Sequence, residues 1–336
     1  MASFRNSEPD SGGKASPVAN LLIERQRTGS KPGHRTDGRR LSLIIEGGAM
    51  RGVVSAGMVS ALEQLGLRDC FDEVYGSSAG SITGAYFIAN QARFGTTIFY
   101  NEINNSHFID LARVVSSKPI VSLSYLLDEV CRTKVPLSVP AVLESDIPLK
   151  IISASVERRE AAVLGNFRDA DELFTAMRAS ANIPYFAGSP VLFRGEHYLD
   201  ASLYASIPFA QAMLNNPTDL VVLMTRPKGQ KRSDPNWIDK LVVAPQLRRI
   251  DPQLASHYLS RAAEYQKELD YITQGSQRES GPNILPIQTA VGTHKISPFE
   301  KSREKLVSAA ISGFAAVYDA LGRPHSRIAE IITVYD

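Results

Sequence analysis

From residue 41 onward, segments in which apolar residues form a compact run are followed by segments in which they recur at helical spacing. Residues 41–45 form a compact apolar run, which favours a buried strand. Apolar positions at helical spacing fill residues 53–65, and Gly66 stands where a helix C-cap belongs. Residues 71–75 predict a second short strand, and helical spacing resumes after Ser78. This strand–helix–strand–helix order predicts a right-handed crossover and a parallel sheet.

The rest of the chain carries the same two patterns in a less regular order. Residues 94–148 are mostly helical in pattern, with turns rich in Ser and Pro. Further strands are expected at residues 149–156, 160–167, 195–199, 219–225 and 283–291, the second of them returning beside the first as a hairpin. Further helices are expected at residues 169–181, 253–272 and 297–321. The mixture predicts an α/β protein.

Composition divides the chain into three parts. Residues 1–40 are rich in Ser, Gly, Pro and basic residues, with eight Lys and Arg against four Asp and Glu. They predict a basic, partly disordered tail with a short docked helix near residues 18–27. Residues 41–225 hold the clearest strand and helix signals and predict the folded core of the protein. Residues 226–336 predict a mostly helical C-terminal extension packed on the same domain.

The composition is that of a globular protein, with 43% apolar and 21% charged residues among 336. A formal net charge of +2 gives no whole-protein field that would attract nucleic acid, so we expect no such partner. Two cysteines, Cys70 and Cys131, are too few for a disulfide framework or a metal site. We expect them to be reduced core residues, and we expect no metal and no other cofactor.

The sequence contains no signal for a membrane span. No apolar run approaches the roughly 20 residues that cross a bilayer, and the N-terminus lacks the basic-then-apolar plan of a secretory signal. We therefore expect a cytoplasmic protein that meets a membrane only at its surface. The basic tail and the loop at residues 226–232, close to the single tryptophan Trp237, suit peripheral contact with anionic lipid. Plain solvation is the commoner role of such segments.

Ser78 is the centre of a G-x-S-x-G pattern that runs from Gly76 to Gly80. The pattern suits a serine on a sharp strand-to-helix turn, where small neighbours allow a strained backbone and leave the hydroxyl exposed. Alone it occurs by chance in many chains, but the strand before it and the helix after it supply the context that a nucleophile needs. The alternative is a small-residue turn in which Ser78 only caps the helix. The side chain of Ser77 is expected to point elsewhere.

A second glycine turn, EGGAMRG at residues 46–52, follows the first strand. It lacks the Lys and Ser/Thr of a phosphate-binding P-loop, and Gly48 is misplaced for a dinucleotide fingerprint. An oxyanion hole fits better, because it needs only small residues and free N–H groups at a helix start. Arg51 suits either a structural salt bridge or a contact with an anionic lipid head group. The two turns together favour acyl transfer.

A serine nucleophile needs a base to take its proton. A Ser–Asp–His order would place the histidine late, which leaves His257, His294 and His325, but none follows a clear strand in a suitable turn. Asp200 ends a short strand and precedes small residues, in the loop layer where parallel sheets carry ligands and catalysis. An ordinary turn or capping aspartate has the same spacing, so the residues alone leave this choice open.

Four motifs in order resemble one known family. EGGAMRG, GSSAG, MRASANIPYFAGSPV and YLDASLYASIP, spread over the predicted core, are similar to those of patatin-like phospholipases, particularly bacterial members. The resemblance implies a three-layer α/β/α fold with a mostly parallel central sheet, and hydrolysis of acyl esters of lipids. It also implies a Ser–Asp dyad without histidine. Ser78 would be the nucleophile, Asp200 its base, and the amides around Gly47, Gly48 and Ala49 the oxyanion hole.

The chain departs from the family pattern at two places. Ala49 stands where the family usually has a third glycine, and Asp200-Ala201-Ser202 replaces the usual Asp-Gly-Gly or Asp-Gly-Ala. Alanine costs little where φ is negative and more where φ is positive. The leading hypothesis is a serine esterase of phospholipase A or lysophospholipase type. The alternatives are a catalytically weakened lipid-binding or regulatory protein and a histidine-dependent Ser-His-Asp esterase.

Overall fold

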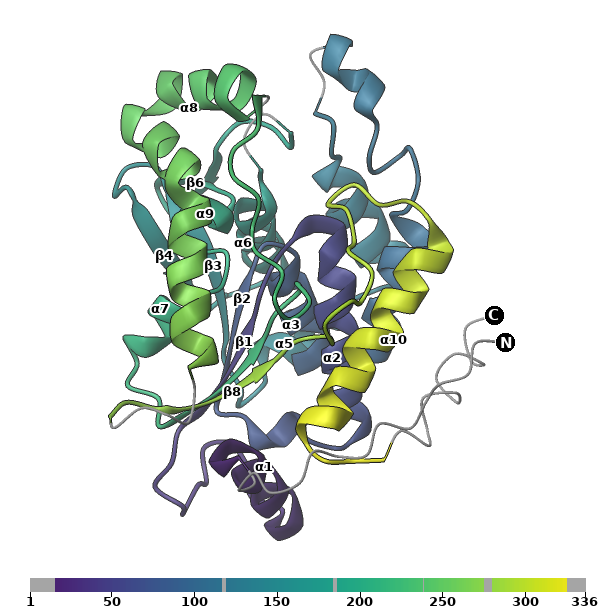
Figure 1. The fold of residues 1–336 in the computed structure, drawn as a ribbon, viewed down its shortest axis with the longest axis vertical. Coiled ribbons are helices and arrows are strands. Elements are labelled where there is room, and N and C mark those ends of the chain that lie inside the picture. The colour runs from purple at the N-terminus through teal and green to yellow at the C-terminus, as the bar shows by residue number, and fades with distance from the viewer. Residues whose placement is uncertain (1–15, 117–118, 184–185, 238, 275–279, 325–336) are drawn as a thin grey trace.

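A computed structural model describes residues 16–116, 119–183, 186–237, 239–274 and 280–324. These residues form an eight-stranded sheet in the order β5-β6-β3-β2-β1-β7-β8, with β4 also paired to β3 (Figure 1). The strands are β1 Leu41–Ile45, β2 Glu73–Ser77, β3 Leu149–Ser155, β4 Glu160–Leu164, β5 Val191–Phe193, β6 Glu196–Leu199, β7 Asp219–Leu223 and β8 Asn283–Ile287. Neighbouring strands from β3 through β2, β1 and β7 to β8 pair in parallel. The pairs that involve β4, β5 and β6 are antiparallel.

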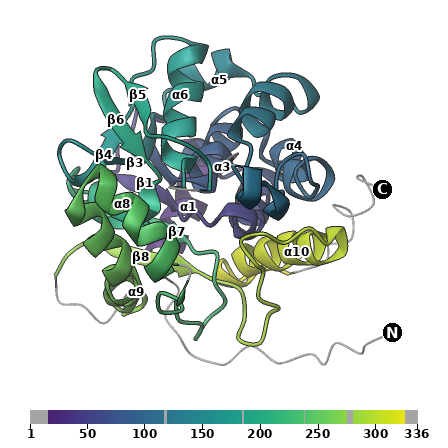
Figure 2. The ribbon, with the colours of Figure 1, turned by 90° about the horizontal axis from the view of Figure 1, so that it is seen from above.

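Helices cover both faces of this sheet (Figures 1 and 2). They are α1 Pro17–Thr28, α2 Gly52–Gln64, α3 Ala79–Ile88, α4 Ala92–Thr97, α5 Val139–Leu143, α6 Ala170–Ala181, α7 Phe209–Met213, α8 Ala244–Ile250, α9 Pro252–Thr273 and α10 Arg303–Ala320. Short 3-10 segments are Ala49–Arg51, Arg68–Cys70, Leu111–Ser116 and Ala201–Leu203, and π-helical segments are Ile98–Glu102, Tyr125–Lys134 and Asp239–Val243. One face carries α2, α3, α4, α6 and α10, and the other carries α7 and α9.

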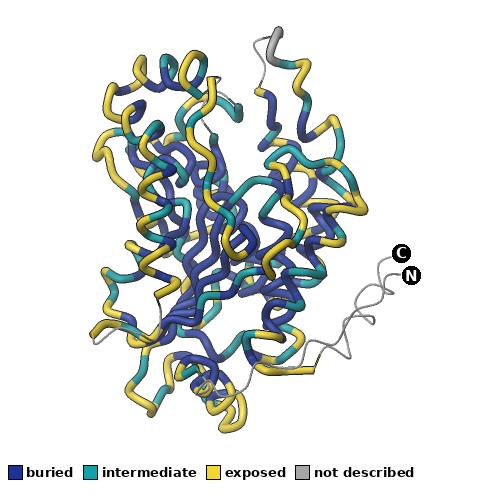
Figure 3. The backbone as a smooth tube through the Cα atoms, in the orientation of Figure 1, coloured by how far each residue is buried: buried dark blue, intermediate teal, exposed yellow. Residues whose placement is uncertain are grey.

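Side chains of the central strands alternate between two buried cores. In β1, Leu43 and Ile45 join the core on the α2 and α3 face, whereas Ile44 joins the core on the α9 face. In β7, Val221 and Val222 divide in the same way. Because both faces are covered, these strands are mostly apolar and are buried along their whole length, and they form the centre of Figure 3. The predicted three-layer α/β/α fold is confirmed.

Most predicted strands lie within a few residues of their observed positions, and β4 returns antiparallel beside β3 as the predicted hairpin. Strand β5 has no counterpart in the sequence prediction. It is three residues long, which is too short to establish a period of two. The mostly helical pattern predicted before β3 corresponds to short helices and two π-helical segments.

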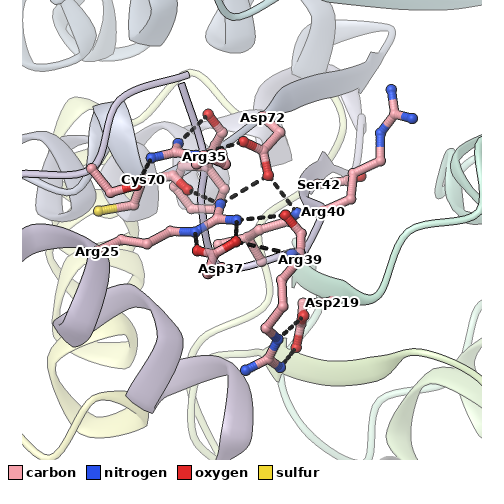
Figure 4. Close-up of polar contacts among 12 residues, drawn as sticks. Arg25, Arg35, Asp37, Arg39, Arg40, Ser42, Cys70, Asp72 and Asp219 are labelled. Carbon is pink, nitrogen blue, oxygen red and sulfur yellow. Dashed lines mark hydrogen bonds and ion pairs between the residues drawn. The ribbon is translucent and has the colours of Figure 1, made fainter. Parts of the chain in front are cut away.

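The segment before β1 is anchored by one buried arginine (Figure 4). Arg25 of α1 is 1% exposed and donates hydrogen bonds to the carboxylates of Asp37 and Asp72 and to the carbonyls of Cys70 and Arg39. These contacts tie α1 to the chain that enters β1 and to the chain that enters β2. Helix α1 is the predicted docked helix, and the first 15 residues of the predicted tail lie outside the described part of the chain.

The C-terminal part of the chain completes the same sheet and packs on the same core. Strand β8 pairs in parallel with β7, and α10 packs against α2. A Cβ on Gly57 would lie 2.0 Å from the carbonyl oxygen of Ala310, and one on Gly313 would lie 2.1 Å from that of Val54. The two helices therefore approach backbone to backbone, and only glycine fits at these two positions.

Cys70 and Cys131 are free and buried, as predicted. Burial raises the pKa of the Cys70 thiol to about 11 and that of Cys131 to about 12, so both are protonated at neutral pH. Among the described residues, no helix has the length and apolar character needed to cross a bilayer.

Candidate active site

Ser78 stands at the junction between β2 and α3. Strand β2 ends at Ser77 and α3 begins at Ala79, so Ser78 forms the turn by itself. Its backbone has φ 52° and ψ −126°, a conformation that L-residues rarely adopt. The residue is 7% exposed. The strand before it and the helix after it are the context in which a G-x-S-x-G serine is presented as a nucleophile.

The two glycines of this pattern allow the turn to form, because no side chain fits at either position. A Cβ on Gly76 would lie 2.5 Å from the carbonyl oxygen of Gly80, and a Cβ on Gly80 would lie 2.4 Å from that of Ile45. Both neighbours are backbone atoms and cannot rotate away. The spacing of the pattern therefore follows from the close approach of α3 to β1 and β2.

Two neighbouring serines hold the turn in place. Ser180 of α6 accepts a hydrogen bond from the Ser78 amide, with 2.8 Å between N and Oγ. Ser77 Oγ donates to the carbonyl oxygen of Ser206 at 2.6 Å and accepts from the Gly47 amide at 3.2 Å. The prediction that Ser77 points elsewhere is confirmed. Sequence reasoning missed the role of Ser180, because no local pattern links two positions 102 residues apart.

Asp200 follows β6 and is 1% exposed. Its Oδ1 accepts a hydrogen bond from the Ser202 amide at 2.8 Å, and its own amide donates to the Asn182 carbonyl at 2.9 Å. Its Oδ2 is buried and has no hydrogen-bond partner in the described part of the chain. Buried carboxylate oxygens are usually satisfied, so this one has unused capacity to accept a proton.

Ser78 and Asp200 lie close enough to influence each other. Burial raises the pKa of the Asp200 carboxyl above its ordinary value of 3.8, and the hydroxyls of Ser202 and Ser78 oppose this by favouring the charged form. The Ser78 hydroxyl and Asp200 do not form a hydrogen bond of ordinary geometry, because Oδ2 has no partner. Catalytic hydrogen bonds are often long before a substrate binds.

The turn after β1 lies directly against Ser78. A Cβ on Gly47 would lie 2.8 Å from the Cβ of Ser78. The Gly47 amide, one of the three predicted oxyanion donors, is already hydrogen-bonded to Ser77. The amides of Gly48 and Ala49 lie at the start of the 3-10 segment and have no acceptor among the described residues. The geometry therefore favours these two donors over Gly47.

The two departures from the family pattern differ in backbone conformation. Ala49 has φ 52°, so an alanine occupies a left-handed conformation that glycine adopts more easily. Ala201 is not among the residues with positive φ, and it is fully buried in the 3-10 segment that follows Asp200. The strain is therefore at the candidate oxyanion turn and not at the aspartate.

Glu46 links β1 to the loop after β7. It is fully buried, and it accepts hydrogen bonds from Arg226 at 2.9 Å and from the Thr225 amide at 2.6 Å. Arg51 forms no ion pair with a described residue, and its buried Nε has no hydrogen-bond partner. Arg226, and not Arg51, therefore makes the structural salt bridge. The basic loop that was expected in solvent turns Arg226 inward, where it is 7% exposed.

The histidines of the alternative esterase have other surroundings. His257 of α9 is half-buried and packs on Tyr204, with 4.8 Å between ring centroids. His294 is exposed in the loop after β8. Neither forms a hydrogen bond with the serine or the aspartate of the candidate pair. His325 lies outside the described residues.

An apolar pocket opens beside Ser78. Its lining includes Ser78 and Ala49 at the candidate site and continues along α3 and α4 to Tyr86 and Leu126. Together with its open mouth it encloses about 630 Å³ of space that no protein atom fills. Thr83 is one of its few polar residues, and its buried Oγ1 has no hydrogen-bond partner. An apolar chain would fit next to the serine. No periodicity in the sequence indicated this pocket.

The sequence model of the patatin-like phospholipases matches residues 43–213, about half of the chain. The protein belongs to the patatin-like phospholipase family. The matched residues include both glycine turns, Ser78 and Asp200, so the resemblance inferred from the four motifs is confirmed. Membership of the patatin-like phospholipases supports lipid acyl hydrolysis in general.

Two further similarities are more distant. It is 27% identical over 203 residues to YjjU of Escherichia coli (strain K12), itself an uncharacterized protein, and the match covers 60% of this chain and 56% of YjjU. The chain thus spans about half the length of that relative. It is also similar to the crystal structure of VipD from Legionella pneumophila, with a TM-score of 0.39 and 11% identity over 84% of this chain and 67% of VipD.

Proposed function

We propose that this patatin-like protein is a serine hydrolase that cleaves acyl esters of phospholipids or related lipids through a Ser78–Asp200 dyad. One observation carries most weight. A serine in a strained turn lines an apolar pocket, and its hydroxyl lies near a buried aspartate that has one unused carboxylate oxygen. The pocket suits the acyl chain, and the pair suits proton transfer during ester cleavage.

In the first step, Ser78 Oγ attacks the ester carbonyl carbon while its proton passes to Asp200 Oδ2. The carbonyl oxygen becomes an oxyanion, and the amides of Gly48 and Ala49 donate hydrogen bonds to it. When the tetrahedral intermediate collapses, the bond between the carbonyl carbon and the alcohol oxygen breaks. The leaving alcohol takes the proton from Asp200, and the acyl group stays esterified to Ser78.

In the second step, a water molecule gives a proton to Asp200 while its oxygen attacks the acyl carbonyl carbon. Ser78 Oγ then leaves and recovers a proton from Asp200, which releases a fatty acid and restores the starting state. The raised pKa of Asp200 suits this role, because such a carboxylate accepts a proton more readily than an ordinary aspartate does.

Ser78→Ala and Asp200→Asn test the dyad. Each should lower kcat for p-nitrophenyl butyrate by about 1,000-fold or more, because acyl transfer loses its nucleophile or its base. Ser308→Ala and Asp234→Asn change exposed residues and are matched controls that should keep wild-type rates. Circular dichroism spectra should agree among all the variants. Wild-type turnover by Ser78→Ala would eliminate Ser78 as the nucleophile.

A fluorophosphonate probe distinguishes a serine hydrolase from a lipid-binding or regulatory protein. The folded wild-type protein should be labelled at Ser78, as located by mass spectrometry of its peptides. The noncatalytic alternative draws on the strained backbone of Ala49 and on the engaged amide of Gly47, which leaves one donor fewer for an oxyanion. Folded protein that binds lipid vesicles but leaves the probe unreacted would support that alternative.

A further inference from the structure

Ser206 joins three segments of the chain next to the candidate dyad. Its carbonyl oxygen accepts a hydrogen bond from Ser77 Oγ at 2.6 Å, which ties it to the end of β2 directly before Ser78. Its hydroxyl accepts from Nη1 of Arg232 at 2.5 Å, and this contact brings in the loop after β7. Ser206 itself belongs to the short segment between Asp200 and α7. The segments that carry the nucleophile, the base and Arg232 therefore meet at one residue.

The chain from Asp200 to Ser206 is short and has hydrogen bonds of its own. The Leu203 amide donates to the Asp200 carbonyl at 3.2 Å, and the Ala205 amide donates to the Ala201 carbonyl at 2.7 Å. These bonds leave little freedom between the aspartate and Ser206. A contact that holds Ser206 in place therefore also helps to hold the aspartate beside the nucleophile, where small displacements are costly for the reaction.

Arg232 has a positive charge that no neighbouring carboxylate neutralises. It forms no ion pair with a described residue, whereas Arg226 pairs with Glu46 and Arg261 pairs with Asp239, each at 2.9 Å. The charged and titratable groups that face Arg232 from α9, the turn after β1 and its own loop are Tyr258, Arg261, Tyr265, Glu46, Arg51 and Arg226. Burial, followed by the neighbouring arginines, lowers the pKa of Arg232 to about 9, which still leaves it charged at neutral pH.

Asp200 is the carboxyl group that this charge can act on. It forms no ion pair with a described residue either, and its buried Oδ2 has no hydrogen-bond partner among them. Burial raises the pKa of Asp200, and the rise is opposed by Ser202, by Ser78 and then by Arg232, whose charge has the largest effect of any charged side chain. Opposite charges attract more strongly in a buried site than in water, because the dielectric constant is lower there. Arg232 thus favours the ionised form of Asp200, which is the form that accepts a proton.

We propose that Arg232 is a positioning residue of the dyad: it holds the segment that carries Asp200 through Ser206, and its charge keeps the aspartate ionised. This role rests on the proposed Ser78–Asp200 mechanism. Arg232 does not line the apolar pocket, so it acts on the dyad and not on the acyl chain. Its effect should therefore appear in kcat and in the pH dependence of the rate, and not in the KM for a short acyl ester.

Arg232→Gln tests the charge. Removing the cation should raise the pKa of Asp200 further, and Asp200 must be ionised to take the serine proton. The acid limb of kcat/KM for p-nitrophenyl butyrate should therefore move to higher pH by about 1 pH unit. Arg232→Lys keeps the charge and should return the limb towards its wild-type position. Rates measured between about pH 4 and pH 8 locate the limb.

Ser206→Ala tests the hydrogen bond separately, because it leaves the charge of Arg232 in place. It should lower kcat on the pH plateau by about 3- to 10-fold and leave the acid limb where it is. Arg248→Gln, at an exposed arginine of α8, makes the same change in net charge as Arg232→Gln and should alter neither quantity. KM should stay within about twofold of the wild-type value in all these variants.

An acid limb that stays at the wild-type pH in folded Arg232→Gln would overturn the proposal. An equal shift in Arg248→Gln would assign the effect to net charge and would overturn it as well. Circular dichroism shows whether each variant is folded. If Arg232→Gln does not fold, wild-type kcat in Ser206→Ala would be the result that rejects the positioning role.

Labelling of Ser78 by a fluorophosphonate probe repeats the test without turnover. The labelling rate of Arg232→Gln should show the same displaced acid limb, because the probe also needs the ionised base. A wild-type protein that neither hydrolyses the ester nor reacts with the probe would count against the proposed function. Hydrolysis and labelling that depend on Ser78, together with an unmoved limb in Arg232→Gln, would count against the role of Arg232 alone.

Discussion

Ala49 combines a left-handed backbone conformation with a position in the turn proposed to bind the oxyanion. An L-residue in this conformation costs roughly 1–2 kcal/mol. Strain of this kind persists where the surroundings determine the backbone. Here the turn is held by the hydrogen bond between Gly47 and Ser77 and by the ion pair between Glu46 and Arg226. The neighbouring contacts thus keep alanine where the family usually has glycine.

Ala49→Gly should raise the free energy of unfolding by about 0.5–1 kcal/mol, because relief of the left-handed strain outweighs the added freedom of the unfolded chain. Ala201→Gly is the matched control. Ala201 does not have positive φ, so its replacement should lower the free energy of unfolding by about 0.5–1 kcal/mol. Urea denaturation followed by circular dichroism measures both. A loss of stability in both variants would contradict the strain assigned to Ala49.

Asp200→Asn should make the protein more stable at pH 7, by about 1–2 kcal/mol, because a buried carboxylate with an unsatisfied oxygen is replaced by a neutral amide. The raised pKa of Asp200 means that the native state binds a proton more tightly than the unfolded chain. Wild-type stability should therefore fall as pH rises from the ordinary value of 3.8 through the raised pKa. Below 3.8 the carboxyl is protonated in both states, and the advantage of the variant should vanish.

Urea midpoints of the wild type and of Asp200→Asn between about pH 4 and pH 8 measure this dependence. Asp234→Asn, at an exposed position, should show no such pH-dependent gain. A constant difference between Asp200→Asn and the wild type over the whole range would mean that Asp200 does not titrate there.

At the residue scale, a local pattern was sufficient to single out Ser78. Gly76 and Gly80 flank it within one short turn, and no side chain fits at either glycine. Asp200 needed the family resemblance, since a capping aspartate has the same spacing. The partners of these residues could not be predicted. Ser180 and Arg226 reach the site from segments more than 100 positions from the groups they bind, and no sequence period connects such distances.

The pair of helices α2 and α10 shows how an element far along the chain supports the candidate site. Helix α2 follows the oxyanion turn directly, and its backbone touches that of α10 at Gly57 and Gly313. Two buried residues of α10, Phe314 and Val317, belong to the same core as α2 and α3. The position of the turn therefore depends on a helix near the end of the chain.

Gly57→Ala should lower the free energy of unfolding by about 3 kcal/mol, because the added Cβ would lie 2.0 Å from the carbonyl oxygen of Ala310. Helix propensity acts the other way and favours alanine by about 1 kcal/mol, so a net loss isolates the close helix contact. Gly165→Ala is the control, since its Cβ would lie at an ordinary 3.5 Å from the nearest atom. Thermal unfolding measures both, and equal effects would contradict the packing described.

Element prediction succeeded where the apolar run or the helical period was clear. The strands β1 and β7 were located as short apolar runs, and the amphipathic helix α9 was located from its helical spacing over several turns. The order of strands in the sheet could not be derived from the sequence. Strand β7 pairs with β1, although 173 residues separate the end of β1 from the start of β7 along the chain. The register of a strand also depends on the packing of both faces of the sheet.

At the scale of the whole molecule, one end carries exposed apolar side chains close to α8, which lies at the upper left of Figure 1. Trp237 is 67% exposed and Leu241 is 72% exposed, just before α8. Leu111, 59% exposed, lies in the 3-10 segment Leu111–Ser116 that belongs to the projecting part at the upper right of the same view. Apolar and aromatic residues at such places suit shallow insertion between lipid head groups. We propose that this end of the molecule faces the membrane.

Trp237→Ser combined with Leu241→Ser should weaken binding to vesicles that contain anionic lipid by about 10-fold or more, because two large apolar side chains no longer enter the lipid. Leu214→Ser is the control, since Leu214 is 79% exposed directly after α7, away from α8 in Figure 1. Flotation of protein with vesicles measures binding. Equal binding by the double variant and the wild type would contradict this orientation. Deletion of the whole N-terminal segment is a poorer test, because it removes the buried Arg25.

For the whole molecule, the alternation of strands and helices was enough to predict three layers. Net charge was less informative. A total of +2 suggested no strong electrostatic feature, yet Arg51 and Arg232 lie together without carboxylate partners among the described residues. A sum over the chain cannot reveal where charges meet, because folding brings the turn after β1 beside the loop after β7.

The hydroxyl of Ser77 joins the two glycine turns, since it accepts from Gly47 and donates to the carbonyl of Ser206. In the proposed mechanism, this cross-link preorganises the site: the nucleophile and the amides that face it keep a constant separation before any lipid arrives. Little conformational freedom then remains to be lost at the transition state. A residue that never touches the substrate would thus help to set the rate at which the ester is cleaved.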